Sequence, residues 1–148
     1  MFDFLLKNSA SLANLKEFIA LVIRATVDEV LVFKDEDFYE KADVLDLSSC
    51  SCLCLFSYVQ GDAEVFLQLF RCALEAAELK ERVISMSASL GVECYVPDPI
   101  SNTWTCVANN GVLSDVVMVD SESEGCFYFV QDGPSMSPLP IVVCVSKT

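Results

Sequence analysis

The chain has 148 residues, of which 53% are hydrophobic, and it carries a formal net charge of −13. The length predicts one domain over residues 1–148, and the charge excludes nucleic acid and anionic membranes as partners. No uncharged stretch reaches the roughly 20 apolar residues of a membrane helix, and the N-terminal residues do not form a signal peptide. We therefore expect a cytoplasmic protein whose large partners are basic.

The first sixty residues predict a helix followed by strands. Apolar residues recur at spacings of three and four over residues 12–23, which predicts an N-terminal helix. A strand over residues 27–33, an acidic loop or turn over 34–41, and two further strands over 42–47 and 49–59 should follow.

The apolar period then changes to 3.6, so one long central helix should begin at Asp62 as the N-cap and end at Gly91. Asn109–Gly111 and residues 121–125 predict hairpin turns, and three prolines make residues 132–140 an extended loop. Short strands rich in β-branched and aromatic residues should cover residues 91–96, 103–108, 112–120, 125–130 and 140–146. The predicted fold class is α+β, with helices packed on a mainly antiparallel sheet and a C-terminal antiparallel β-meander.

Three cysteines alternate along the third strand. Cys50, Cys52 and Cys54 should share one face with Phe56 and Tyr58, about 6.6 Å apart along the strand. That spacing suits neither a disulfide between neighbours nor a tetrahedral metal site, and a reducing compartment keeps thiols free. We therefore expect these cysteines to fill the core, and we predict no metal and no cofactor.

The chain contains no histidine, which removes Ser–His and Cys–His nucleophile pairs. Its five glycines form no phosphate-binding loop. We predict no catalytic residue and no enzymatic activity. Trp104 and Cys106 share one face of a predicted strand, where they either anchor a ligand pocket or pack in the core.

Acidic residues are dense between residues 28 and 46, where only Lys34 and Lys41 are basic. An aromatic pair, Phe38 and Tyr39, lies inside this run, and aromatic side chains ringed by carboxylates are typical of a hot spot for a basic partner. Two alternatives are that Phe38 tucks under the loop and that the C-terminal sheet forms the interface. The predicted partner-binding residues are Asp28, Glu29, Asp35, Glu36, Asp37, Phe38, Tyr39, Glu40 and Asp43.

In size, charge and missing chemistry the chain resembles bacterial toxin-immunity proteins, although no motif carries the resemblance. It implies an inhibitor, or antitoxin, that neutralises a basic toxin or nuclease. The predicted order of helix, three strands and helix over roughly residues 10–90, with Phe56–Val59 ending a strand, is also similar to acidic type III secretion chaperones. Those bind an extended effector segment as homodimers. A third hypothesis is a small-ligand-binding α+β domain.

Overall fold

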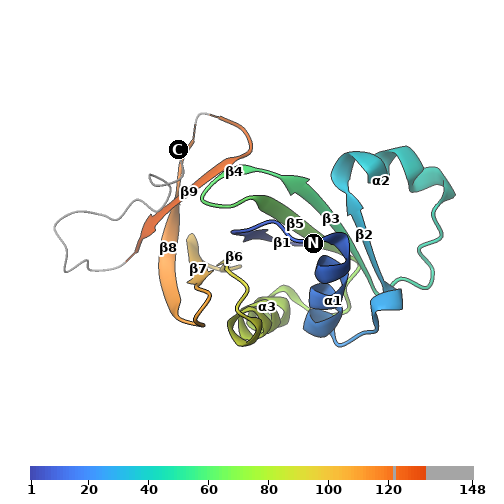
Figure 1. The fold of residues 1–148 in the computed structure, drawn as a ribbon, viewed down its shortest axis with the longest axis horizontal. Coiled ribbons are helices and arrows are strands. Elements are labelled where there is room, and N and C mark those ends of the chain that lie inside the picture. Colours follow the sequence, from blue (N-terminus) through green and yellow to red (C-terminus); the bar gives the residue numbers. More distant parts are fainter. Residues whose placement is uncertain (122, 133–148) are drawn as a thin grey trace.

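The computed structural model describes residues 1–121 and 123–132, which form one strongly curved mixed sheet with three α-helices (Figure 1). The helices are α1 (Leu12–Ile23), α2 (Asp35–Lys41) and α3 (Ala76–Leu90), with short 3₁₀ turns at Val27–Glu29 and Ala42–Val44. The strands are β1 (Phe2–Leu6), β2 (Val30–Lys34), β3 (Cys52–Tyr58), β4 (Gln60–Gly61), β5 (Val65–Phe70), β6 (Cys94–Pro97), β7 (Thr103–Val107), β8 (Leu113–Val119) and β9 (Cys126–Gln131). The α+β class is confirmed.

The strand order is β2-β3-β5-β1-β6-β7-β8-β9-β4. Neighbours are antiparallel except at the two ends, where β2 pairs with β3 and β4 pairs with β9 in parallel. The predicted meander is present as β6 to β9. Because β4 lies between β3 and β5 in the chain, its pairing with β9 brings the last strand of the meander back to the β3–β5 connection. The sheet therefore curls over one of its own faces.

The first core lies between the sheet and helices α1 and α3, which lie together beneath the sheet in Figure 1. We call it the helix-side core. Cys52, Cys54 and Phe56 point into it and are buried, so two of the three alternating cysteines fill the core as predicted. Cys50 precedes β3 and is half-buried, and Tyr58 is exposed at the end of the strand.

The second core lies on the opposite face, inside the curl of the sheet, and is mainly aromatic. The rings of Tyr95 and Phe129 stack with their centroids 4.2 Å apart, and Phe66 stacks on Phe127 at 6.0 Å. Trp104 meets Phe129 edge-on at 5.3 Å. Trp104 and Cys106 therefore pack in this aromatic core, and the core alternative for them is confirmed.

Two residues make the closure between β4 and β9. Gly61 has φ +102, and a Cβ at this position would overlap the carbonyl oxygen of Phe127, so only glycine fits there. Asp62 is buried, its backbone N–H donates to the Phe127 carbonyl at 2.8 Å, and its Oδ2 accepts a hydrogen bond from the Phe129 N–H at 2.9 Å. The prediction that Asp62 caps a long helix is wrong, because this residue fastens the curled sheet.

The long central helix is also wrong over its first part. Residues 65–70 form β5, which pairs with β3 on one side and β1 on the other. Val65, Leu67 and Leu69 alternate into the helix-side core. The helix begins only at Ala76, and it ends at the predicted C-cap, Gly91, with φ +72.

The segment between β2 and β3 differs from the prediction as well. Residues 35–41 are a helix rather than a loop, and the strand predicted over residues 42–47 is a 3₁₀ turn followed by irregular chain. Parallel strands cannot be joined by a hairpin. This segment must therefore run from the C-terminal end of β2 back to the N-terminal end of β3, where Cys52 pairs with Val30.

At the N-terminus, β1 was not predicted. In the C-terminal half, the turns at Gly111 and Gly125 have positive φ and join antiparallel strands as expected. The strand predicted over residues 140–146, and the predicted loop from residue 133 onward, lie outside the described residues.

Candidate functional site

Helix α2 carries most of the predicted partner-binding residues. It begins immediately after the edge strand β2, and its first turn consists of Asp35, Glu36 and Asp37. Negative side chains are favourable there because the N-terminal end of a helix carries partial positive charge, and Lys41 complements the opposite end. The acidic run that suggested a loop therefore supports a two-turn helix.

An aromatic contact anchors α2 to the sheet. Phe33 in β2 faces away from the helix-side core, and its ring lies 6.1 Å from that of Phe38. Tyr39 touches Phe38 edge-on at 5.8 Å, yet 71% of Tyr39 is exposed. The two aromatic residues therefore have different roles: Phe38 holds the helix against the sheet, as the alternative in which it tucks under this segment proposed, and Tyr39 is available for contact.

Most charged residues of α2 form no ion pair with the residues that the structure describes. Lys34 Nζ lies 2.8 Å from Glu36 Oε1 and 5.4 Å from the centroid of the Tyr58 ring. The hydrogen bond from Lys34 lowers the pKa of Glu36. Among the residues that the structure describes, this is the one ion pair that involves α2.

We define the acidic surface as Asp35, Glu36, Asp37, Tyr39, Glu40 and Asp43. All of these except the half-buried Asp35 are exposed, and Glu36 is the one already paired with a lysine. β2 separates α2 from the 3₁₀ turn at Val27–Glu29, and Figure 1 shows α2 apart from α1 and α3. The carboxylates therefore stand on α2 and on the 3₁₀ turn Ala42–Val44 that follows it.

The structure does not bring Asp28 and Glu29 to this surface. They lie in the 3₁₀ turn before β2, separated from α2 by the five residues of that strand, or roughly 16 Å. Glu29 also serves the fold, because its Oε2 accepts hydrogen bonds from the Thr26 N–H at 3.4 Å and from the Ser51 hydroxyl at 3.3 Å. The predicted set is thus split between the two ends of β2.

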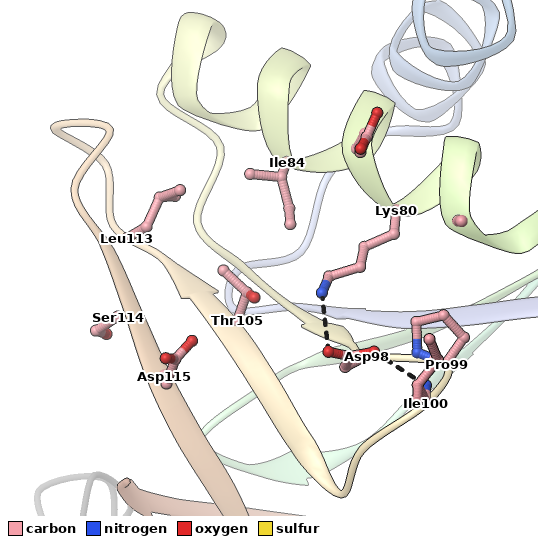
Figure 2. Close-up of a pocket in the computed structure, with 11 residues that line it drawn as sticks. Lys80, Ile84, Asp98, Pro99, Ile100, Thr105, Leu113, Ser114 and Asp115 are labelled. Carbon is pink, nitrogen blue, oxygen red and sulfur yellow. Dashed lines mark hydrogen bonds and ion pairs between the residues drawn. The ribbon is translucent and has the colours of Figure 1, made fainter. Parts of the chain in front are cut away.

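A cleft that sequence reasoning missed lies between α3, the β6–β7 connection and the strands β7 and β8 (Figure 2). Its volume is about 690 Å³. Lys80 Nζ lies 3.4 Å from Asp98 Oδ2, and Asp98 Oδ1 accepts the Ile100 N–H at 2.9 Å. That backbone hydrogen bond, together with Lys80, lowers the pKa of Asp98. The lysine is therefore occupied, and the other two charged residues of the cleft, Glu81 and Asp115, are acidic.

The rim of this cleft is apolar. Ile100 is 95% exposed and Leu113 is half exposed, and Figure 2 shows them on opposite sides of the Lys80–Asp98 pair. The sequence signal for this cleft was Ile100. It lies in the turn-forming segment Pro97–Asn102, where an apolar side chain has no core to enter. The cleft has the size and composition to hold a small cationic group.

Comparison with known proteins found no family model, no curated protein and no solved structure that matches this chain. Within residues 1–121 and 123–132, no cluster of three cysteine, aspartate or glutamate side chains is placed to hold a metal ion. In the same part of the chain, no helix is both long and apolar enough to cross a membrane.

Proposed function

We propose that this protein is a binding protein that neutralises a basic partner protein, as an immunity or antitoxin-type inhibitor of a toxin or nuclease does. The observation that carries the proposal is the acidic surface: exposed carboxylates surround an exposed tyrosine on a helix whose other aromatic residue is anchored in the sheet. A formal charge of −13 adds long-range attraction for a positively charged protein.

The contact would work through two effects. The carboxylates of Asp37, Glu40 and Asp43 would steer the basic partner during association. Tyr39 would supply the buried contact, because a tyrosine with few rotatable bonds loses little entropy when it is covered. Phe38 would hold α2 in place and make little direct contact.

The first experiment is capture from a lysate of the source organism at low and high salt, with native mass spectrometry of the eluate. One basic protein bound 1:1 supports the proposal and supplies the partner for the kinetic test. A homodimer bound to an unfolded segment would favour the secretion-chaperone alternative. The resemblance to secretion chaperones is weakened, because the chain after Phe56–Val59 forms the strand β5 where that resemblance implied a helix.

The kinetic test compares two double charge reversals with the same change in net charge. Asp37→Lys with Glu40→Lys alters the acidic surface, and Glu17→Lys with Asp120→Lys alters exposed positions elsewhere. The first variant should slow association at least tenfold at low salt, with a smaller effect at high salt. Equal slowing by both variants would show that only total charge matters and would move the interface away from α2.

Small-ligand binding is a second candidate, favoured by the cleft of about 690 Å³ between α3 and β7–β8. Its chemistry suits an amine-bearing molecule. Titration with a series of alkylamines, followed by NMR, should perturb Thr105 and Ser114 in the native protein and not in an Asp115→Asn variant. Unchanged spectra at millimolar amine would remove this candidate.

A further inference from the structure

Two cysteines that are distant in sequence meet at the end of the helix-side core. The Sγ atoms of Cys52 and Cys72 lie 2.7 Å apart and form a thiol–thiol hydrogen bond. A disulfide bond is roughly 2.05 Å long, so the sulfurs need to approach by only about 0.7 Å to become bonded. All seven cysteines among the described residues are free thiols.

The backbone at the end of β5 sets up this contact. Arg71 has φ +63, a left-handed conformation that non-glycine residues rarely adopt. It turns the chain out of β5 and toward α3, so that Cys72 returns to the end of β3 where Cys52 lies. The contact is therefore built into the connection between two core elements.

The two thiols differ in access. Cys52 is fully buried, whereas Cys72 is half-buried and lines an open cavity of about 310 Å³ together with Met1, Arg71 and Glu75. A molecule the size of a peroxide fits this cavity and reaches Cys72 first.

The two thiols also differ in acidity. When Cys72 is ionised, the Cys52 thiol donates the hydrogen bond, which lowers the pKa of Cys72. The same hydrogen bond, together with burial, raises the pKa of Cys52. The reactive thiolate is thus the accessible member of the pair, as in cysteines that react with peroxides.

We propose that Cys72 and Cys52 form a peroxide-reactive pair, in which Cys72 is the attacking thiolate and Cys52 the resolving thiol. The Cys72 thiolate attacks one oxygen of a hydroperoxide, the O–O bond breaks, and the other oxygen leaves and takes up a proton as water or an alcohol. Cys72 is then a sulfenic acid. The Cys52 sulfur attacks the Cys72 sulfur, the hydroxyl leaves with the Cys52 proton as water, and the disulfide forms. The two thiols supply the two electrons that reduce the peroxide.

The test treats the folded, full-length protein with hydrogen peroxide, blocks the remaining thiols and digests with trypsin. Cleavage after Lys41, Arg71 and Lys80 places Cys52 in peptide 42–71 and Cys72 in peptide 72–80, so the disulfide links two separate peptides. The linked pair should appear in proportion to peroxide and disappear after reduction with dithiothreitol.

Three variants assign the roles. Cys72→Ala should consume peroxide at least tenfold more slowly and give no linked pair. Cys52→Ala should stop at the sulfenic acid, which dimedone labels on peptide 72–80. Cys54→Ala is the matched control, because Cys54 is equally buried on the same face of β3 and should leave the linked pair unchanged.

Several results would overturn the proposal. One is a folded wild-type protein, verified by circular dichroism, that keeps all its thiols in excess peroxide. Another is a link from peptide 72–80 to Cys50 or Cys54 in place of Cys52. Peroxide consumption that is equally fast without Cys72 would also overturn it. These results leave the proposed partner binding untouched, because the pair and the acidic surface share no residue.

Discussion

The helix-side core and the aromatic core lie on opposite faces of one sheet, but they depend on different parts of the chain. Among the described residues, the helix-side core contains twenty buried side chains from two helices and most strands, whereas the aromatic core contains five. Many small apolar contacts hold the first together. The second is closed by a short strand, one glycine and one aspartate. The helix-side core should therefore tolerate most single substitutions, whereas a substitution at Gly61 or Asp62 should open the aromatic core.

The largest expected effect is at Gly61. An alanine there would overlap the Phe127 carbonyl and would have to adopt φ +102, so Gly61→Ala should destabilise by about 3 kcal/mol or more. The matched control is Gly125→Ala, where φ is +73 but no atom lies within 4 Å of the added Cβ, and where we expect about 1 kcal/mol. Chemical denaturation measures both. Equal losses of stability in the two variants would mean that the close contact of β4 with Phe127 contributes nothing beyond the strain of a positive φ.

Asp62 should give the next largest effect. Asp62→Ala removes the acceptor for the buried Phe129 N–H, which should cost about 2 kcal/mol. Asp62→Asn retains an oxygen acceptor and should lie between alanine and the wild type. If alanine and asparagine variants were equally stable, the hydrogen bond to Phe129 would not hold the curl closed.

The helix-side core should respond to alkaline pH. Burial raises the pKa of Cys54 and of Cys94 to about 12, from an ordinary value of 9.0. Between about pH 9 and pH 12 the unfolded chain therefore loses thiol protons that the folded chain retains, and stability falls as pH rises. The slope should be up to about 1.4 kcal/mol per pH unit for each thiol. Unfolding of Cys54→Ala followed from pH 8 to 11 should show a smaller slope, and an unchanged slope would contradict the burial of this thiol.

In the same core, Cys54→Ser should destabilise by on the order of 1–3 kcal/mol, because it places a hydroxyl among apolar side chains. The matched control is Cys50→Ser, at a half-buried position outside β3. It should stay within about 0.5 kcal/mol of the wild type. A Cys54→Ser variant as stable as the control would show that the cysteine row is not part of the core.

The smallest effect on stability should come from α2. Asp37→Lys with Glu40→Lys removes two exposed carboxylates that form no ion pair with described residues, so unfolding should change by less than about 0.5 kcal/mol. Thermal unfolding measures this directly. A large loss would mean that the acidic surface supports the fold, which would weaken its proposed role in partner binding.

The burial of each strand in the two cores explains which strands could be predicted from the sequence. The meander was predictable because β6 to β9 are short runs rich in β-branched and aromatic residues, and because the β7–β8 and β8–β9 connections contain Asn–Gly or Gly. In β5, by contrast, residues on both faces are apolar, since Val65 enters one core and Phe66 the other. Such a doubly covered strand also fits a helical period of 3.6, so the pattern alone does not distinguish the two.

The candidate site was predictable only in part. Composition located the carboxylates of α2 and the aromatic pair, but it could not separate the anchored Phe38 from the exposed Tyr39, because that depends on the contact of Phe38 with Phe33 in β2. It also grouped Asp28 and Glu29 with α2, although five residues of extended strand separate them. The Cys52–Cys72 contact depends on the positive φ of Arg71, which no sequence pattern announces.

The central position of β1 has a consequence for how the protein is made. β1 precedes both of its partners, β5 and β6, in the chain, so it has no strand partner until residues 65–70 and 94–97 have left the ribosome. The curl closes later still, when β9 reaches β4. Pairing between such distant segments is slow and leaves apolar strands exposed. During translation, Phe2 and Phe4, which are buried in the folded protein, therefore stay without their partners Leu69 and Leu67 until β5 has emerged.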